Sequence, residues 1–169
     1  MSSDKFILIV ALSFTLAPGC TADKQTAEKH TPVNPSALPL KFDASQQIGA
    51  WVDMWNTYDL SGVDKLFFDS ENATYFSSEK EGLIIGIEAL RRHHEGFGFV
   101  PGGKIQDNKL WVANLHTNIF GPVAVVTGIW YFEKGPRENR QVQRGPVTFV
   151  YVATPDGYRL AHTHFAGYN

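Results

Sequence analysis

The sequence predicts an α+β domain in which helices come first and a long antiparallel sheet follows. Before Gly102-Gly103 the apolar residues recur at helical spacing, and after it they alternate at every second position. The alternating segments are separated by short turns rich in glycine and proline, which is typical of an antiparallel meander. Because helices and strands are segregated along the chain, the class is α+β.

The helical part of the sequence contains three predicted helices. The first begins after Asp43, which together with Gln46 three residues later resembles a capping box. A second, shorter helix is predicted over Ser61–Phe68, and a third opens at Gly86 and stops at Gly96. The first helix carries an aliphatic and aromatic stripe at helical spacing: Ile48, Trp51, Val52, Trp55 and Tyr58.

The strands are predicted from short apolar runs and from period-two alternation. Two short segments, Asn72–Ser77 and Gly82–Ile85, lie between the second and third helices. The turn Pro155-Asp156-Gly157 combines a fixed φ, a side chain that bonds to the backbone and a residue that tolerates positive φ. Four longer strands follow the helices: Lys104–Asn118, Val123–Lys134, Gln141–Thr154 and Tyr158–Gly167.

The N-terminal segment predicts export and lipidation. Phe6–Ala17 is an apolar run of signal-peptide length, and it is shorter than the roughly 20 residues that a membrane span needs. It ends at Ala17-Pro18-Gly19-Cys20, which resembles the lipobox of bacterial lipoproteins, where the cysteine is acylated and becomes the mature N-terminus. We therefore predict a signal peptide over residues 1–19 and lipidation of Cys20; the alternative is an ordinary secretory signal that leaves a free thiol.

Residues 20–41 are expected to form the lipidated cysteine and a flexible linker, because they are polar, contain three prolines and show no apolar periodicity. The folded domain is then residues 42–169. This organisation predicts a lipid-anchored, extracytoplasmic protein of the cell envelope. Thr21 lacks the aspartate that often marks inner-membrane retention, which favours the periplasmic side of the outer membrane in a two-membrane bacterium.

Composition excludes several classes of function. A net charge of −2 gives no basic field for nucleic acid. The sequence has no nucleophile elbow, phosphate loop or dinucleotide fingerprint, and no compact metal-ligand motif. We therefore expect no nucleic-acid partner, no cofactor and no metal. The aromatic content of 13% is high. A cavity lined by aromatic rings would suit small apolar or enol-forming substrates.

The order of these elements resembles the SnoaL-like (DUF4440-type) branch of the nuclear transport factor 2-like (NTF2-like) superfamily. The resemblance spans roughly residues 44–168 and is carried by Gly86–Leu90, Val123–Gly128 and the closing stretch Asp156–His164. It implies N-terminal helices packed on a curved antiparallel sheet that encloses a cone-shaped cavity, with frequent dimers through the outer sheet face. Members include isomerases, cyclases, dehydratases and proteins that only bind or assemble.

The pair His162 and His164 offers the first candidate for chemistry. Strict alternation would place both on the face of Tyr158 and Leu160, so we expect them to face the cavity. As acid–base groups they would titrate near neutral pH, and we name them as candidate catalytic residues. Two alternatives stay open, a metal pair that would need a third ligand and a purely structural role.

Three further residues are candidates for binding a substrate. Trp55 would form a platform or belong to the core, and Tyr75 would donate a hydrogen bond inwards or anchor the sheet. An inward Arg144 would select an anionic ligand, whereas an outward one would be solvated. Steroid-isomerase-type members carry a catalytic aspartate where this chain has no carboxylate before Glu79, so that mechanism is not expected.

These observations predict a protein that binds a small, largely apolar molecule, with or without histidine-based turnover of the isomerase, cyclase or dehydratase type. The alternative is a non-catalytic module that forms a homodimer or docks a partner through its outer sheet face. In that case Trp111 or Trp130 would make the contact. In either case the lipid anchor would be the contact with the membrane.

Overall fold

A computed structural model describes residues 41–168, so the predicted signal peptide, Cys20 and nearly all of the linker lie outside the described residues. The elements are α1 (Ala44–Thr57), α2 (Ser61–Leu66), β1 (Thr74–Phe76), β2 (Leu83–Ile85), α3 (Ile87–Gly96), β3 (Lys109–Phe120), β4 (Val123–Lys134), the 3-10 helix η2 (Arg137–Asn139), β5 (Gln141–Thr154) and β6 (Gly157–Phe165). Within residues 41–168, the helices all fall short of the length and apolarity that a bilayer crossing requires.

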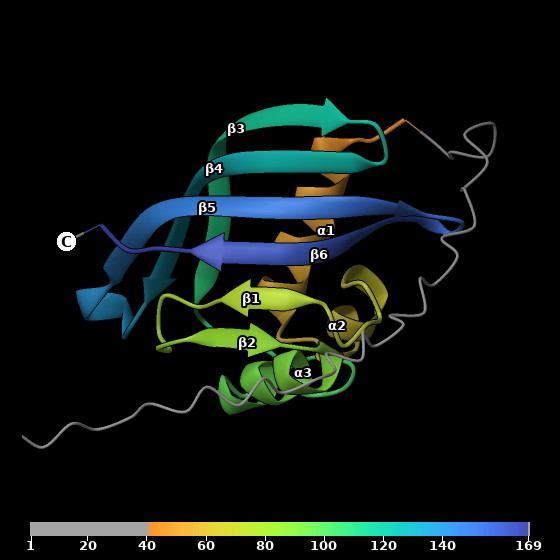
Figure 1. Ribbon diagram of the computed structural model, residues 1–169. Coiled ribbons are helices and arrows are strands. Elements are labelled where there is room, and N and C mark those ends of the chain that lie inside the picture. The colour runs from red at the N-terminus through yellow and green to blue at the C-terminus, as the bar shows by residue number, and fades with distance from the viewer. Residues whose placement is uncertain (1–40, 169) are drawn as a thin grey trace, which may run out of the picture. The chain divides into compact units, whose positions relative to one another are not determined.

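The six strands form one open sheet in the order β2-β1-β6-β5-β4-β3, with α1 crossing behind it in Figure 1. This confirms the α+β class. The sheet is mixed rather than purely antiparallel, because β1 pairs with β6 in parallel. No hairpin constrains that pair, since β2, α3, β3, β4 and β5 lie between the two strands in the chain. We call the face that packs on α1 the inner face and the opposite face the outer face.

Helix α1 is positioned by the capping expected from the sequence. The Asp43 side chain accepts a hydrogen bond from the Gln46 backbone N–H at 3.1 Å. At the other end Tyr58 takes the left-handed conformation, with φ of 53°, and its N–H closes on the Met54 carbonyl. The aromatic stripe faces the sheet, where the Trp51 ring stacks on Phe165 of β6 with centroids 5.3 Å apart.

One extra residue in β6 changes which side chains face inwards. Tyr151 of β5 pairs with Leu160, whereas its neighbour Val150 pairs with His162. Ala161 therefore has no partner of its own and forms a β-bulge. A bulge shifts the alternation of a strand by one position, so predictions based on strict period two fail beyond it.

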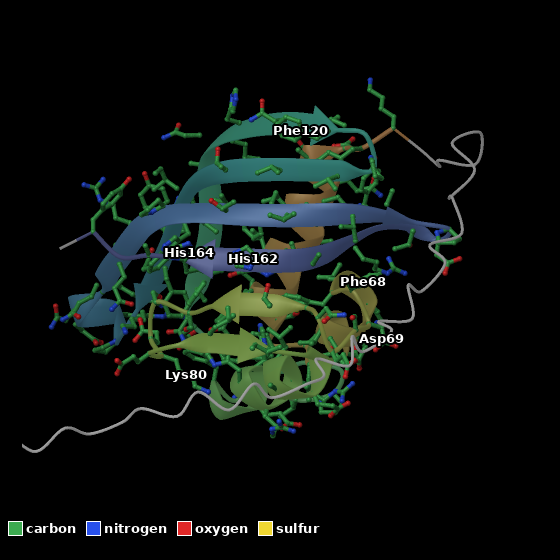
Figure 2. The ribbon with its side chains drawn as sticks, in the orientation of Figure 1. Phe68, Asp69, Lys80, Phe120, His162 and His164 are labelled. Carbon is green, nitrogen blue, oxygen red and sulfur yellow. The ribbon has the colours of Figure 1, made fainter. Side chains whose placement is uncertain are left out.

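The expected orientation of the two histidines is accordingly wrong. Leu160 before the bulge faces inwards as predicted, but after it Thr163 and Phe165 are the buried inner residues. His162 and His164 point to the outer face, where His164 is exposed. Both are labelled on β6 in Figure 2, in which the sheet lies between the viewer and α1.

A second bulge lies in β3, between Ala113 and His116. Asn114 there has φ of 56°, and the facing residue of β4 is Gly128. A Cβ at Gly128 would lie 2.9 Å from the Ala113 carbonyl oxygen, so the close approach of the two strands requires glycine. Bulges bend strands and increase their twist, which fits the strong curvature of β3 and β4 in Figure 1.

The segment after β6 runs along the end of β5. The N–H groups of Ala166 and Tyr168 donate to the carbonyls of Pro146 and Arg144 at 3.1 and 3.0 Å. The Trp130 indole N–H donates to the Ala166 carbonyl at 2.8 Å. Any side chain at Gly145 would overlap that carbonyl, so glycine allows this segment to lie against the sheet.

Candidate ligand-binding cavity

A cavity of about 240 Å³ lies between α1 and the inner face of the sheet. Its walls are mostly aromatic, and most of the rings come from α1, β1, β4 and β6. The main wall residues are Trp51, Trp55, Tyr75, Trp130, Phe132 and Phe165. Such a wall excludes water and presents flat ring surfaces to a bound molecule.

Trp55 is held in place by the edges of other rings. Its ring meets Phe97, Phe99 and Phe132 in T-shaped contacts with centroids 5.4, 5.0 and 6.3 Å away. Edge-to-face pairs fix the relative orientation of aromatic rings. The wall is therefore built before any ligand arrives, so a ligand would not have to order it.

Polar side chains lie mostly at one end of the cavity. Ser77, Ser78 and Glu79 follow the end of β1, and Lys134 is the last residue of β4. Gln143 faces them from the start of β5, where it pairs with Phe132. Ser78 and Glu79 are exposed, whereas Trp51 at the other end is buried. The cavity thus has an apolar interior and a polar mouth.

Three polar atoms of wall residues are buried without a hydrogen-bond partner among residues 41–168. They are Nε1 of Trp51, Nε1 of Trp55 and Oε1 of Gln143. An unmet buried donor or acceptor costs on the order of 1–3 kcal/mol. A molecule with both donor and acceptor groups would complement this wall better than a hydrocarbon would.

Trp55 and Tyr75, two of the residues singled out in the sequence, line this cavity. Burial raises the pKa of the Tyr75 hydroxyl well above its ordinary range, so the phenol is neutral and can donate a hydrogen bond. Arg144 instead has its side chain on the outer side of β5. Its guanidinium carbon lies 5.9 Å from the centre of the Tyr168 ring.

His162 and His164 do not line the cavity. His162 Nδ1 is 2.8 Å from Oγ1 of Thr74, a hydrogen bond that joins β6 to β1 on the outer face. The ring of His164 lies 5.1 Å from that of Phe76. Partial burial, and the nearby His164, lower the pKa of His162. This placement fits the structural alternative.

Metal binding finds no geometric support in residues 41–168. No group of three or more histidine, cysteine, aspartate or glutamate side chains comes together there. The two outer histidines have ring centroids 6.5 Å apart and no third protein ligand beside them.

Trp130 was one of two tryptophans proposed for a contact on the outer face, and for Trp130 that placement is wrong. It is 5% exposed, lines the cavity and donates its indole N–H to Ala166. Trp111 does lie on the outer face, where its ring stacks parallel to Tyr131 of β4 at 5.0 Å. β4 is apolar on both faces over much of its length. Its sequence therefore does not reveal whether the odd-numbered or the even-numbered residues face inwards.

Sequence reasoning did not predict the burial of His94, which lies fully buried behind the cavity wall. Its Nδ1 lies 2.8 Å from the Leu90 carbonyl oxygen; a carbonyl can only accept, so Nδ1 carries the proton. Nε2 of the neutral ring is then an acceptor, and it has no partner among residues 41–168. Burial lowers the pKa of His94 to about 4. The sequence did offer one indication of this burial. His94 lies four residues after Leu90, and therefore on the same apolar side of α3.

Comparisons with solved structures identify the fold. The chain is similar to an NTF2-like superfamily protein from Salmonella enterica serovar Typhimurium, with TM-score 0.62, 21% identity and coverage of 74% of this chain and 88% of that one. It is similar to a protein from Streptomyces avermitilis provisionally assigned as a dehydratase of the NTF2-like family, with TM-score 0.62, 15% identity and coverage of 74% and 94%. The CaMKII hub of S. rosetta matches with TM-score 0.60, 16% identity and coverage of 76% and 100%.

No protein-family model and no curated protein matches the sequence. At identities of 15–21% the structural likeness establishes the fold alone. The described domain therefore has an NTF2-like fold, as the resemblance in the sequence implied. The narrower SnoaL-like assignment stays a prediction.

The buried His94 predicts loss of stability in acid. The unfolded chain protonates this imidazole below its ordinary pKa of 6.5, whereas the folded domain does so only near 4. The unfolded state therefore binds more protons between these values, and stability falls as pH falls through that window. The shift corresponds to about 3 kcal/mol, which urea denaturation at pH 7 and at pH 4 would measure.

A variant pair isolates the contribution of His94. His94→Phe keeps an aromatic ring in the site and should lose less stability between the two pH values than the wild type does. His116→Phe, at an exposed position of β3, should keep the wild-type dependence. Equal acid sensitivity in the wild type and His94→Phe would show that His94 does not cause it.

Proposed function

We propose that this domain binds a small, largely apolar molecule in the cavity between α1 and the sheet. The observation that carries the proposal is an aromatic-walled cavity of about 240 Å³ with its polar groups gathered at the mouth. Sites for drug-sized ligands typically measure about 300–1,000 Å³, so the expected ligand is smaller than these. The similarity to a provisionally assigned dehydratase supports a ligand-binding role.

An acid–base reaction inside the cavity would have to use groups other than His162 and His164, because both lie on the outer face. The groups available in the lining include the neutral phenol of Tyr75, the exposed carboxylate of Glu79 and the amine of Lys134. Ligand binding requires none of these groups to transfer a proton. The proposal is therefore binding, and turnover would be an addition to it.

Filling the cavity should abolish binding. N-phenyl-1-naphthylamine, a neutral probe whose fluorescence rises in apolar sites, should bind the wild type with a saturable signal. Leu110→Phe adds a ring at a lining position of β3 and should weaken binding at least tenfold. Ile119→Phe makes the same change at an exposed position of the same strand and should bind like the wild type. Equal titration curves for all three proteins would place the probe elsewhere.

We also propose that the protein is exported and anchored to the cell envelope through a lipid on Cys20. The apolar run and the lipobox-like tetrapeptide that ends at Cys20 support this location. Each buried acyl CH₂ contributes about 0.8 kcal/mol, so several chains on one cysteine would hold the domain at a membrane. Residues 21–41 would then act as the tether between the lipid and the cavity-bearing domain.

Lipidation is tested with the full chain expressed in a bacterium. The wild type should incorporate labelled palmitate, pellet with membranes and accumulate as a precursor when globomycin inhibits lipoprotein processing. Cys20→Ser should remain unlabelled. A wild-type protein that is processed without label and stays in the soluble fraction would contradict the anchor and would support an ordinary secretory signal.

A second candidate function is association through the outer face. Phe76, Leu83 and Ile85 are 37%, 43% and 58% exposed and lie together on the outer side of β1 and β2. Apolar side chains gathered on an exposed sheet face are typical of an interaction surface. The fold shared with the CaMKII hub supports this role, and we propose a homodimer as its simplest form.

A charge on this surface should separate the two copies. Light scattering after gel filtration should report a dimer for residues 41–169 and a monomer for Ile85→Asp. Ile105→Asp, at a fully exposed position outside the sheet, should remain dimeric. A wild-type domain that is monomeric at all concentrations tested would contradict the homodimer without affecting the cavity.

A further inference from the structure

We infer that the ligand of this cavity is an amphipathic anion, a flat apolar molecule bearing a carboxylate that is bound at the mouth by Lys134. The inference rests on the proposed binding function and specifies the chemical class of the ligand. It depends on the positions of two cations, Lys134 and Arg144, and of one anion, Glu79, around the polar mouth.

Lys134 is the cation placed nearest to the apolar interior. It is the last residue of β4. Trp130, Phe132 and Lys134 occupy every second position of that strand, so their side chains share its inner face, and all three line the cavity. Its side chain is half-buried. No ion pair involving Lys134 occurs among residues 41–168, where the carboxylate of the preceding Glu133 instead meets Arg140 at 3.5 Å. A half-buried ammonium group without a carboxylate is a favourable partner for an anionic ligand group.

Arg144 supplies a second cation just beyond the mouth. It lines a groove of about 360 Å³ that shares Ser78, Glu79, Trp130 and Gln143 with the cavity, so the two spaces adjoin. Its guanidinium lies over the ring of Tyr168 and forms no ion pair within the described chain. Although its side chain is not inside the cavity, its charge lies in the groove that adjoins the cavity mouth.

Glu79 is the acidic side chain that lines both spaces, and it opposes binding of an anion. It is exposed, whereas Lys134 is half-buried. Solvent and salt screen an exposed charge more strongly than a half-buried one. The mouth has two cations and one anion, and the charge that solvent screens least is the positive charge of Lys134. The mouth therefore favours a negative group.

The remaining walls limit what carries that negative group. Aromatic rings line the interior, so the body of the ligand is expected to be apolar and flat enough to pack against them. The modest volume leaves little room for a large branched head group. A single carboxylate on a ring system fits both the walls and the mouth.

The experiment compares two probes that share one ring system. Isothermal titration calorimetry at low ionic strength would measure 2-naphthoate against the neutral 2-naphthylmethanol. The carboxylate should bind about tenfold more tightly, and added salt should reduce that preference. Lys134→Gln should bring 2-naphthoate close to the affinity of the alcohol. Arg144→Gln should reduce the affinity for 2-naphthoate by about two- to threefold.

The matched control is Lys109→Gln, which removes an exposed lysine of β3 that does not line the cavity and should leave the preference unchanged. If both probes bind the wild type equally, the anionic ligand class is wrong while the binding cavity stands. If neither binds, the proposed binding function fails as well. A preference that survives Lys134→Gln would overturn the assignment of the carboxylate site to Lys134.

Discussion

The packing of Trp51 and Trp55 on the inner face of the sheet determines the distance between α1 and the strands. Trp51 meets Phe149 of β5 and Phe165 of β6, with centroids 5.1 and 5.3 Å apart, while Trp55 is surrounded by ring edges. Bulky, fully covered side chains of this kind typically contribute about 3–5 kcal/mol each against truncation to alanine. The same two rings form part of the cavity wall, so the contact that stabilises the helix also creates the candidate site.

How far the sequence predicts this molecule depends on how local each feature is. The cap at Asp43 and the stripe of α1 follow from side chains within one helix, and they were predictable from spacing alone. Trp55 faces the cavity because it belongs to the apolar stripe of α1, and Tyr75 does so because the alternation of β1 is unbroken. The parallel pairing of β1 with β6 was not predictable in this way, because it joins distant segments whose spacing carries no turn signal.

For the features that escaped prediction, the local sequence pattern does not reveal which face of the sheet a side chain occupies. One unpaired residue, Ala161, reverses the alternation of β6, and no local propensity marks an alanine as a bulge. In β4, apolar residues occupy both faces, so Trp130 gave no indication of its side. Gln143 and Lys134 are polar residues on an inner alternation, and a pattern that assigns polar residues to solvent places them wrongly. Gln143 and Lys134 are among the residues that make the mouth polar.

The parallel pair of β1 and β6 also bears on the order in which the domain assembles. Thr74 and His162 are bonded across 88 positions of the chain, so closing this contact carries the entropy loss of a long loop. Pairs this distant in sequence form slowly compared with hairpins such as β4–β5. Tyr75 reaches its place in the cavity wall only when β6 is available beside β1. While a ribosome synthesises this chain from its N-terminus, the nascent domain would therefore have an unfinished pocket until β6 emerged.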